Sequence, residues 1–241
     1  MGKPRSKVKS FDISKYLIVE AWRKVEANAG APGVDGVSVK EFRADLRDNL
    51  YKVWNRMSAG SYMPGAVRAV EIPKDHGAGV CVLGVPNVAD RVAQTAVAIV
   101  LEEKLEPILS LRQLWLSTGA VRSGCCGGHA AALLGTGLGC RFGRPGLFDS
   151  VDHDLMMKAV AHHTDCRWVL LYIERWLNAP IMMGDGTLGA REKGTPQGSP
   201  ISPVLANLFM HYAFDRWMER EYLCRSNAWS CLVRQRFRIR G

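Results

Sequence analysis

The stretch that decides the fold is Gly194-Thr195-Pro196-Gln197-Gly198-Ser199-Pro200-Ile201-Ser202-Pro203. Two glycines and three prolines in so short a stretch predict a tightly turning backbone rather than a regular helix or strand. The apolar residues that follow, Leu205, Leu208 and Tyr212, recur at the spacing of one helix face, so a helix is expected near residues 202–220. The sequence therefore predicts a loop that leads directly into a packed helix.

Helices and hairpins surround this loop without the regular alternation of strand and helix that is typical of a parallel sheet. Apolar residues at helical spacing predict helices near residues 15–28, 39–59 and 88–105. Strand-like runs separated by turn residues predict hairpins near residues 66–85 and 180–191. This mixture predicts an α+β fold.

Short polar residues mark the starts of these helices, because their side chains can accept hydrogen bonds from the first free N–H groups of a helix. Gly60 is expected to end the helix over 39–59. Ser38 and Glu41 have the spacing of a capping box. The other expected N-caps are Ser14, Asn87, Asp152 and Asp165.

The chain has 241 residues and a formal net charge of +9, and the excess charge is confined to two segments. Leu111–Leu147 holds four Arg and Leu223–Gly241 holds five, and neither contains Lys, Asp or Glu. Without these nine arginines the 32 Lys+Arg become 23, which equals the 23 Asp+Glu. A basic balance favours nucleic acid as a partner, but the body of the chain is neutral.

The same two segments, 111–147 and 223–241, hold five of the seven Cys and show no sustained helical or strand period. We interpret both as out-of-frame translation of a GC-rich gene, in which off-frame reading is expected to give Arg, Gly and Cys with few Lys, Asp or Glu. A zinc site is the alternative for the first segment, but its ligand spacing fits poorly. The candidate ligands would be Cys125, Cys126, His129 and Cys140.

Elsewhere the chain indicates a cytoplasmic protein without a membrane anchor. The longest apolar run, Ala96–Leu101, is far too short to span a bilayer. Outside the two anomalous segments only Cys81 and Cys166 remain, which suits a reducing compartment.

Three blocks of sequence together resemble the reverse transcriptases encoded by bacterial group II introns. They lie in the family's order and spacing, and they cover roughly residues 15–110 and 148–222. The blocks are Ala21–Val25 with Gly33–Gly36; Ile72–Lys74 with Leu83–Pro86, Asp90, Arg91 and Gln94; and Phe148–Leu155 with Gly194–Leu208.

The resemblance implies the fingers and part of the palm of a right-hand polymerase, truncated and interrupted by the frameshifts. Residues 1–110 would form an N-terminal extension and the fingers, 111–147 an anomalous segment, 148–222 a partial palm and 223–241 an anomalous basic tail. It further implies Mg²⁺ as cofactor, and group II intron RNA and a DNA primer and template as partners. The oligomeric state stays open.

Residue roles follow from the same resemblance. Lys74 would face the nucleotide triphosphate, and Thr195, Pro196, Gln197 and Gly198 would line the nucleotide pocket. Arg91 and Gln94 would help to hold the template side of the bound nucleic acid. Taken alone, Lys74 also fits a solvated turn lysine, and the Thr195–Gly198 stretch also fits an ordinary loop before a helix.

The sequence departs from the family where the family binds metal. A metal-binding Asp is expected six residues before Asp149, where Gly143 stands, and the Tyr-Ala-Asp-Asp block expected soon after Glu221 is replaced by residues without a carboxylate. Asp152 and Asp154 fit a helix cap and a first-turn charge instead. Cys81 stands where the fingers normally carry an Arg. No catalytic or metal-binding residue can therefore be named.

Three functions remain open from the sequence. The chain could be a polymerase, which would need carboxylates that the sequence does not show. It could be a non-catalytic RNA-binding or splicing-assisting fragment, or a pseudogene product without a function. The departures favour a chain that is inactive as a polymerase.

Overall fold

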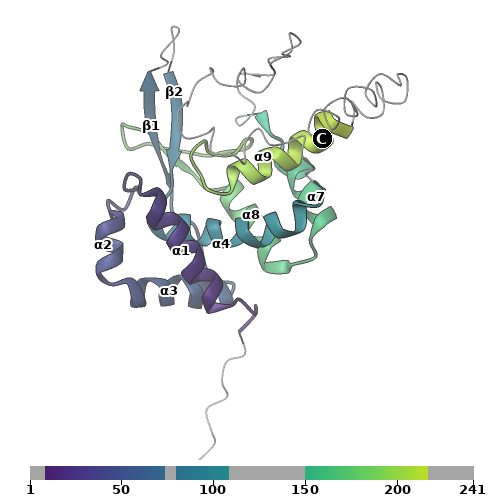
Figure 1. Ribbon diagram of the computed structural model, residues 1–241. Coiled ribbons are helices and arrows are strands. Elements are labelled where there is room, and N and C mark those ends of the chain that lie inside the picture. Colours follow the sequence, from purple (N-terminus) through teal and green to yellow (C-terminus); the bar gives the residue numbers. More distant parts are fainter. Residues whose placement is uncertain (1–8, 74–79, 109–149, 217–241) are drawn as a thin grey trace, which may run out of the picture.

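The computed structural model of the protein describes residues 9–73, 80–108 and 150–216 (Figure 1). Helices pack together as one body, and a hairpin projects from it (Figure 1). The predicted α+β fold is confirmed.

The helices are α1 (Lys15–Asn28), α2 (Val39–Ala44), α3 (Leu46–Ser58), α4 (Val88–Leu105), α7 (His153–His163), α8 (Arg167–Leu177) and α9 (Ser202–Met210), and α9 continues into a π-helical stretch, η2 (His211–Asp215). The strands are β1 (Val67–Pro73), β2 (Val80–Val85), β3 (Ile181–Met182) and β4 (Leu188–Gly189).

The four strands form one mixed sheet in the order β2-β1-β3-β4. The two predicted hairpins are confirmed: β1 pairs with β2, and β3 pairs with β4, both antiparallel. The hairpins are joined by a parallel pairing in which Val67 lies opposite Ile181 and Arg68 opposite Met182. This long-range pairing carries no local signal, and it brings the start of β1 to the segment that precedes loop 194–203.

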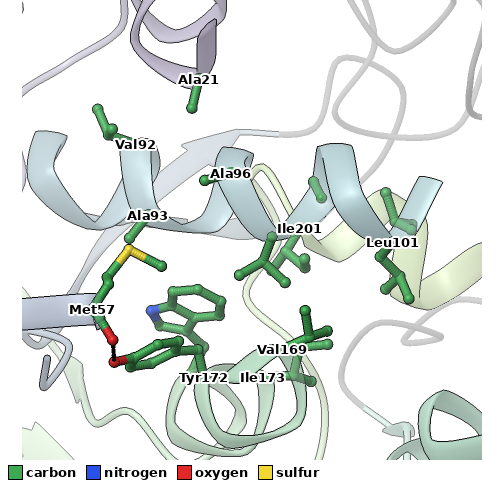
Figure 2. Packing of buried hydrophobic residues seen from close by; sticks show 14 of the residues in the cluster. Ala21, Met57, Val92, Ala93, Ala96, Leu101, Val169, Tyr172, Ile173 and Ile201 are labelled. Carbon is green, nitrogen blue, oxygen red and sulfur yellow. Dashed lines mark hydrogen bonds between the residues drawn. The ribbon is translucent and has the colours of Figure 1, made fainter. Parts of the chain in front are cut away.

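Helix α4 is the centre of the core. Twelve of its residues are buried, and helices pack on more than one of its sides. Figure 2 shows Ala21 of α1 on one side of α4, and Met57 of α3 with Tyr172 of α8 on the other. The hydroxyl of Tyr172 donates a hydrogen bond to the backbone oxygen of Met57 at 2.7 Å. A helix enclosed in this way fixes the positions of the loops that it contacts.

Three of the predicted N-caps are confirmed by side-chain hydrogen bonds. The Ser14 side chain accepts from the Tyr16 N–H. Ser38 and Glu41 form the reciprocal capping box. The Asp152 carboxylate accepts from the Leu155 N–H. Local sequence therefore determines where α1, α2 and α7 begin.

Two predicted caps differ in the structure. Asn87 occupies the N-cap position of α4 as predicted, but its side chain makes no cap bond; its Oδ1 accepts from the Asp35 N–H at 3.3 Å instead. Helix α8 begins after Cys166, which makes no side-chain cap bond, rather than after Asp165. The Asn87 side chain is recruited by the turn around Asp35, so a tertiary contact replaces the local one.

The helix predicted over residues 39–59 is divided. Asp45, with φ −114° and ψ 42°, separates α2 from α3. Gly60 ends α3 as predicted, with φ +72° and a backbone hydrogen bond from its N–H to Met57. The divided helix places Phe42 of α2 against Trp22 of α1, with ring centroids 5.1 Å apart.

Several predictions fall outside the described ranges. The segments 111–147 and 223–241 are among them, as is the end of the helix predicted to run to residue 220. Within the described ranges, no helix combines the length and the apolar character that a membrane span requires.

Candidate functional site

Loop 194–203 is held against the β1–β2 hairpin at Gly84. The Gly84 N–H donates to the backbone oxygen of Gln197 at 2.7 Å. A Cβ at Gly84 would lie 2.7 Å from Cβ of Pro196 and 2.8 Å from Cγ1 of Val67, closer than side-chain carbons can approach. Only glycine permits this contact, so the absence of a side chain at this position sets the distance between the hairpin and the loop.

Hydroxyl groups hold the inside of loop 194–203. The Ser202 hydroxyl donates to the backbone oxygen of Pro196 at 2.8 Å. The Thr195 and Ser202 hydroxyl oxygens are 2.6 Å apart. Since a hydroxyl has one proton and that of Ser202 is used on Pro196, Thr195 is the donor of this second bond. Thr195 and Ser202 are both buried, so these bonds are shielded from water.

The loop is also fixed to α4 through Gln94. The Ser199 hydroxyl donates to Oε1 of Gln94 at 2.7 Å, and only 2% of Gln94 is exposed. Buried amide groups are costly to leave without partners, so this bond fastens the loop to the most buried helix of the described chain. In this structure Gln94 therefore holds loop 194–203 in place.

Gln197 and Gly198 form the accessible part of the same loop. Gln197 is half-buried and Gly198 is exposed. Gly198 has φ +103°, a conformation that favours glycine, and a Cβ at this position would lie 3.0 Å from the Gly84 backbone oxygen. The loop thus presents an exposed, rigidly held backbone turn, which suits close approach of a planar ligand.

Two pockets lie on either side of this turn. The larger, of about 460 Å³, lies between α1, α4 and the second half of the loop, and its lining includes Lys24, Arg91 and Gly198. The smaller, of about 110 Å³, lies between β2, β3 and the first half of the loop. Three of the predicted site residues, Thr195, Pro196 and Gln197, line the smaller pocket, whereas Gly198 and Arg91 line the larger.

Arg91 is largely occupied with the chain's own backbone. Its Nε donates to Pro86 O at 3.1 Å, Nη1 donates to Ala29 O at 3.1 Å, and Nη2 donates to Ala31 O. Burial lowers the pKa of Arg91 from its usual value. The guanidinium therefore shapes the turn at residues 29–31, which forms one wall of the larger pocket, and its direct contact with a template stays a prediction.

A buried carboxylate on α4, Asp90, was missed as a structural anchor. It is 3% exposed and accepts hydrogen bonds from the Tyr62 hydroxyl at 2.7 Å and from the Gly65 N–H at 3.1 Å. Burial raises the pKa of Asp90 to about 6, although both hydrogen bonds act in the opposite direction. The local sequence gave no clear signal for it, because Asp90 precedes Arg91 in the first turn of α4, where the helix dipole favours an exposed carboxylate as well.

The carboxylates near the second block do not form a metal site in the described chain. Asp152 caps α7 and Asp154 is exposed in its first turn. Within residues 9–73, 80–108 and 150–216, no three His, Cys, Asp or Glu side chains gather closely enough to hold a metal. Lys74, Gly143 and Asp149 lie outside the described residues. The donor set described here therefore does not fit a pair of catalytic metal ions.

Comparison with known proteins gives the family. The sequence profile described as reverse transcriptase (RNA-dependent DNA polymerase) matches residues 72–231. Protein YkfC of Escherichia coli (strain K12) is 33% identical over 218 residues, which are 86% of this chain and 55% of that protein. The group II intron-encoded protein LtrA of Lactococcus lactis subsp. cremoris is 25% identical over 195 residues, 79% of this chain and 32% of LtrA.

A fungal protein gives a similar match. The putative COX1/OXI3 intron 1 protein of Saccharomyces cerevisiae is 26% identical over 174 residues, 70% of this chain and 20% of that protein. The chain thus spans about half or less of the length of these relatives. The matched stretch contains β2, α4 and loop 194–203, the elements that build the site. The chain belongs to the reverse transcriptase (RNA-dependent DNA polymerase) family, and its relatives place it with the intron-encoded members.

Proposed function

We propose that this chain provides the nucleotide-binding and template-binding surfaces of an intron-type RNA-directed DNA polymerase. The observation that carries the proposal is the fixation of loop 194–203 by Gly84 on one side and Gln94 on the other. Family members bind nucleic acid, and a preorganised backbone turn is what close recognition of a base pair requires. No such double fixation is needed for an ordinary loop before a helix.

The residue roles divide along the loop. Thr195, Pro196, Gln197 and Gly198 form the nucleotide-facing turn, and Lys74 faces the triphosphate. Thr195 and Pro196 act by holding the turn, since both are buried. Gln197 and Gly198 act by contact, since they form its accessible part.

On the template side, Arg91 and Gln94 act mainly through the backbone that they hold. Arg91 fixes the turn at residues 29–31 by three hydrogen bonds, and Gln94 fixes Ser199. Both elements border the larger pocket, where Lys24 adds a positive charge. A strand of RNA passing there would meet a wall of fixed shape and mixed charge, because Glu102 lines the same pocket as Lys24 and Arg91.

The proposed organisation follows the resemblance. Residues 1–110 form the N-terminal extension and the fingers, and residues 148–222 form part of the palm. We expect the partners to be group II intron RNA with a DNA primer, and the location to be the cytoplasm. Segments 111–147 and 223–241 are the proposed out-of-frame stretches; the test is to read the gene in all three frames, and lack of a family-like peptide beneath residues 111–147 would refute it.

Members of this family use divalent metal ions, and we expect Mg²⁺. Bound metal ions stabilise the charge of the transferring phosphoryl group, and they need carboxylate ligands. Gly143 stands where the resemblance expects one such ligand, and residues 223–241 contain no Asp or Glu. We therefore propose that this chain alone binds RNA but does not synthesise DNA.

Primer extension tests the catalytic half of this proposal. The purified chain is incubated with an RNA template, a DNA primer, deoxynucleotides and Mg²⁺ or Mn²⁺, beside an intact family member. We expect no product above the no-enzyme control. Extension that co-purifies with the chain would overturn the inactivity, and Asp149, Asp152 and Asp154 would be the first residues to replace.

Filter binding tests the other half. We expect the chain to retain RNA with an affinity that falls as salt rises, because phosphate contacts release counterions. If the chain is shown to be folded and still does not bind RNA at low salt, the proposal is rejected. A pseudogene product without this function then remains.

A further inference from the structure

The smaller pocket is lined by two positively charged side chains, and the family resemblance gives neither of them a role. Its walls come from β2, from β3 and from the segment that leads into loop 194–203. Arg191 and Lys193 both line it, Arg191 half-buried and Lys193 exposed. The remaining lining residues are Val82, Gly84, Ile181, Gly194, Thr195, Pro196 and Gln197.

The charge of this pocket has one sign. No carboxylate is among its lining residues. Glu192 lies between the two cations in sequence, but it is exposed and does not line the pocket. Two positive side chains that line one hollow favour a negatively charged ligand, and a guanidinium such as that of Arg191 can bind a tetrahedral oxyanion through two parallel N–H groups.

The backbone that carries these cations is fixed from the side of α7. Lys193 pairs with Asp152 in an antiparallel bridge. The next residue, Gly194, donates its N–H to Val151 O at 2.7 Å, and its own oxygen lies 2.8 Å from Nε2 of His153. Since the backbone is already ordered, a ligand needs to order little beyond the two side chains.

The size of the pocket limits what it can bind. Its volume of about 110 Å³ is well below the roughly 300–1,000 Å³ of pockets that enclose drug-sized molecules. Val82, Ile181 and Pro196 supply apolar wall, and Thr195 and Gln197 supply neutral polar groups. A single phosphate group with a few waters fits these limits, whereas a whole nucleoside does not.

We propose that Arg191 and Lys193 bind one phosphate group beside the nucleotide-facing turn. This inference rests on the proposed function, because it adds a contact to the same loop. The phosphate could belong to the RNA strand or to a free nucleoside triphosphate. We assign it to the RNA strand, because the pocket is too small for a whole nucleoside and the exposed Lys193 makes it accessible to a phosphate of a strand that lies outside it.

The test compares two double variants of equal charge. Arg191→Ala with Lys193→Ala removes the pocket cations, and Lys158→Ala with Arg167→Ala removes two exposed cations of α7 and α8. Binding of labelled single-stranded RNA is followed by fluorescence anisotropy at several salt concentrations. Loss of one phosphate contact should make the slope of log K against log salt shallower by about 0.7, and the control should keep the slope of the unaltered chain.

A second variant and a second ligand complete the test. Arg191→Gln with Lys193→Gln keeps side-chain bulk, so the same result with this pair excludes loss of folding as the cause. Titration with deoxynucleoside triphosphate separates the two sources of phosphate: weaker triphosphate binding with an unchanged RNA slope would support the phosphate site but assign it to the free nucleotide.

The remaining outcomes contradict the inference in distinguishable ways. If the unaltered chain binds RNA and the pocket variants match the control in both assays, the phosphate site is refuted and the proposed function stands. If the unaltered, folded chain binds neither RNA nor triphosphate, both proposals fail.

Discussion

Two loops are held against the same face of α4 by two residues one helical turn apart, Asp90 and Gln94, which differ in whether their side chain can ionise. The linker 59–66, which leads into β1, is held by Asp90 through the Tyr62 hydroxyl and the Gly65 N–H. Loop 194–203 is held by Gln94 through the Ser199 hydroxyl. One anchor is a carboxylate that titrates, and the other is an amide that does not.

The surroundings of the two loops extend this difference. Arg175 of α8 donates from Nη1 to Gly60 O at 2.9 Å and to Tyr62 O at 2.6 Å, so ionisable groups hold linker 59–66 from two sides. In residues 195–203 of the other loop, the side-chain bonds described above join hydroxyl, amide and backbone groups, and the His153 ring reaches that loop at its first residue, Gly194. The comparison teaches that proton binding at Asp90 should stabilise the linker into β1, while the nucleotide-facing loop keeps its shape.

The largest expected effect is the pH dependence of Asp90. Its pKa of about 6 lies above the usual 3.8, so the folded state binds more protons than the unfolded state between about pH 4 and 6. Its contribution to the free energy of unfolding therefore falls as pH rises through that window, by about 3 kcal/mol for two pKa units. Asp90→Asn should lose this dependence, measured by urea unfolding from pH 4 to 7.

Two further variants sharpen this experiment. Asp165→Asn replaces an exposed carboxylate at the junction of α7 and α8, and it should leave the pH profile as in the unaltered chain. Tyr62→Phe removes one hydrogen bond to the Asp90 carboxylate. It should raise the pKa of Asp90, so that stability falls at a higher pH than in the unaltered chain. A difference between the unaltered chain and Asp90→Asn that stays constant from pH 4 to 7 would contradict the assignment.

The next effect concerns the contact that only glycine allows. Gly84→Ala places a methyl group against Pro196 and Val67. We expect the free energy of unfolding to fall by about 2 kcal/mol, as for other overpacked sites, at every pH from 4 to 7. RNA binding should weaken as well, because the hairpin and loop 194–203 must separate. Urea unfolding and the anisotropy assay measure the two effects.

Gly184→Ala is the matched control for this variant. Gly184 lies in the turn between β3 and β4, and beyond its two neighbours in the chain no heavy atom lies within 4 Å of the position that a Cβ would take. The control should change stability by less than about 0.5 kcal/mol. Equal destabilisation by both substitutions would show that the close contact at Gly84 does not fix the loop.

The smallest expected effect tests the uncharged contact, in which Gln94 holds loop 194–203 through Ser199. Ser199→Ala leaves the buried Oε1 of Gln94 without its donor, which should cost about 1.5 kcal/mol in the free energy of unfolding. In contrast to Asp90→Asn, the loss should be the same at pH 4 and pH 7, as measured by urea unfolding. A cost that changed with pH would mean that the two anchors on α4 are coupled rather than independent.

Short-range signals predicted much of the fold. Ser14, the Ser38–Glu41 pair and Asp152 act within three residues of themselves, so their roles as caps follow from the local sequence. The same signals predicted a side-chain cap bond at Asn87 that does not form, because its side-chain Oδ1 accepts from the N–H of Asp35, 52 residues earlier in the chain. A capping residue can have a competing partner, and only the fold shows which one it takes.

The sequence by itself determined the α+β class, most element boundaries, the family and the loop that matters. The class and the boundaries depend on periodicity and spacing, which are properties of neighbouring residues, and the family and the loop follow from the resemblance of three sequence blocks to known reverse transcriptases. The tertiary structure alone decided that Gly84 meets Pro196, that Asp90 binds Tyr62, and that Arg191 and Lys193 share a pocket with β2. The reason is physical: these contacts join segments far apart in sequence, and their geometry is set by how helices and strands pack around α4.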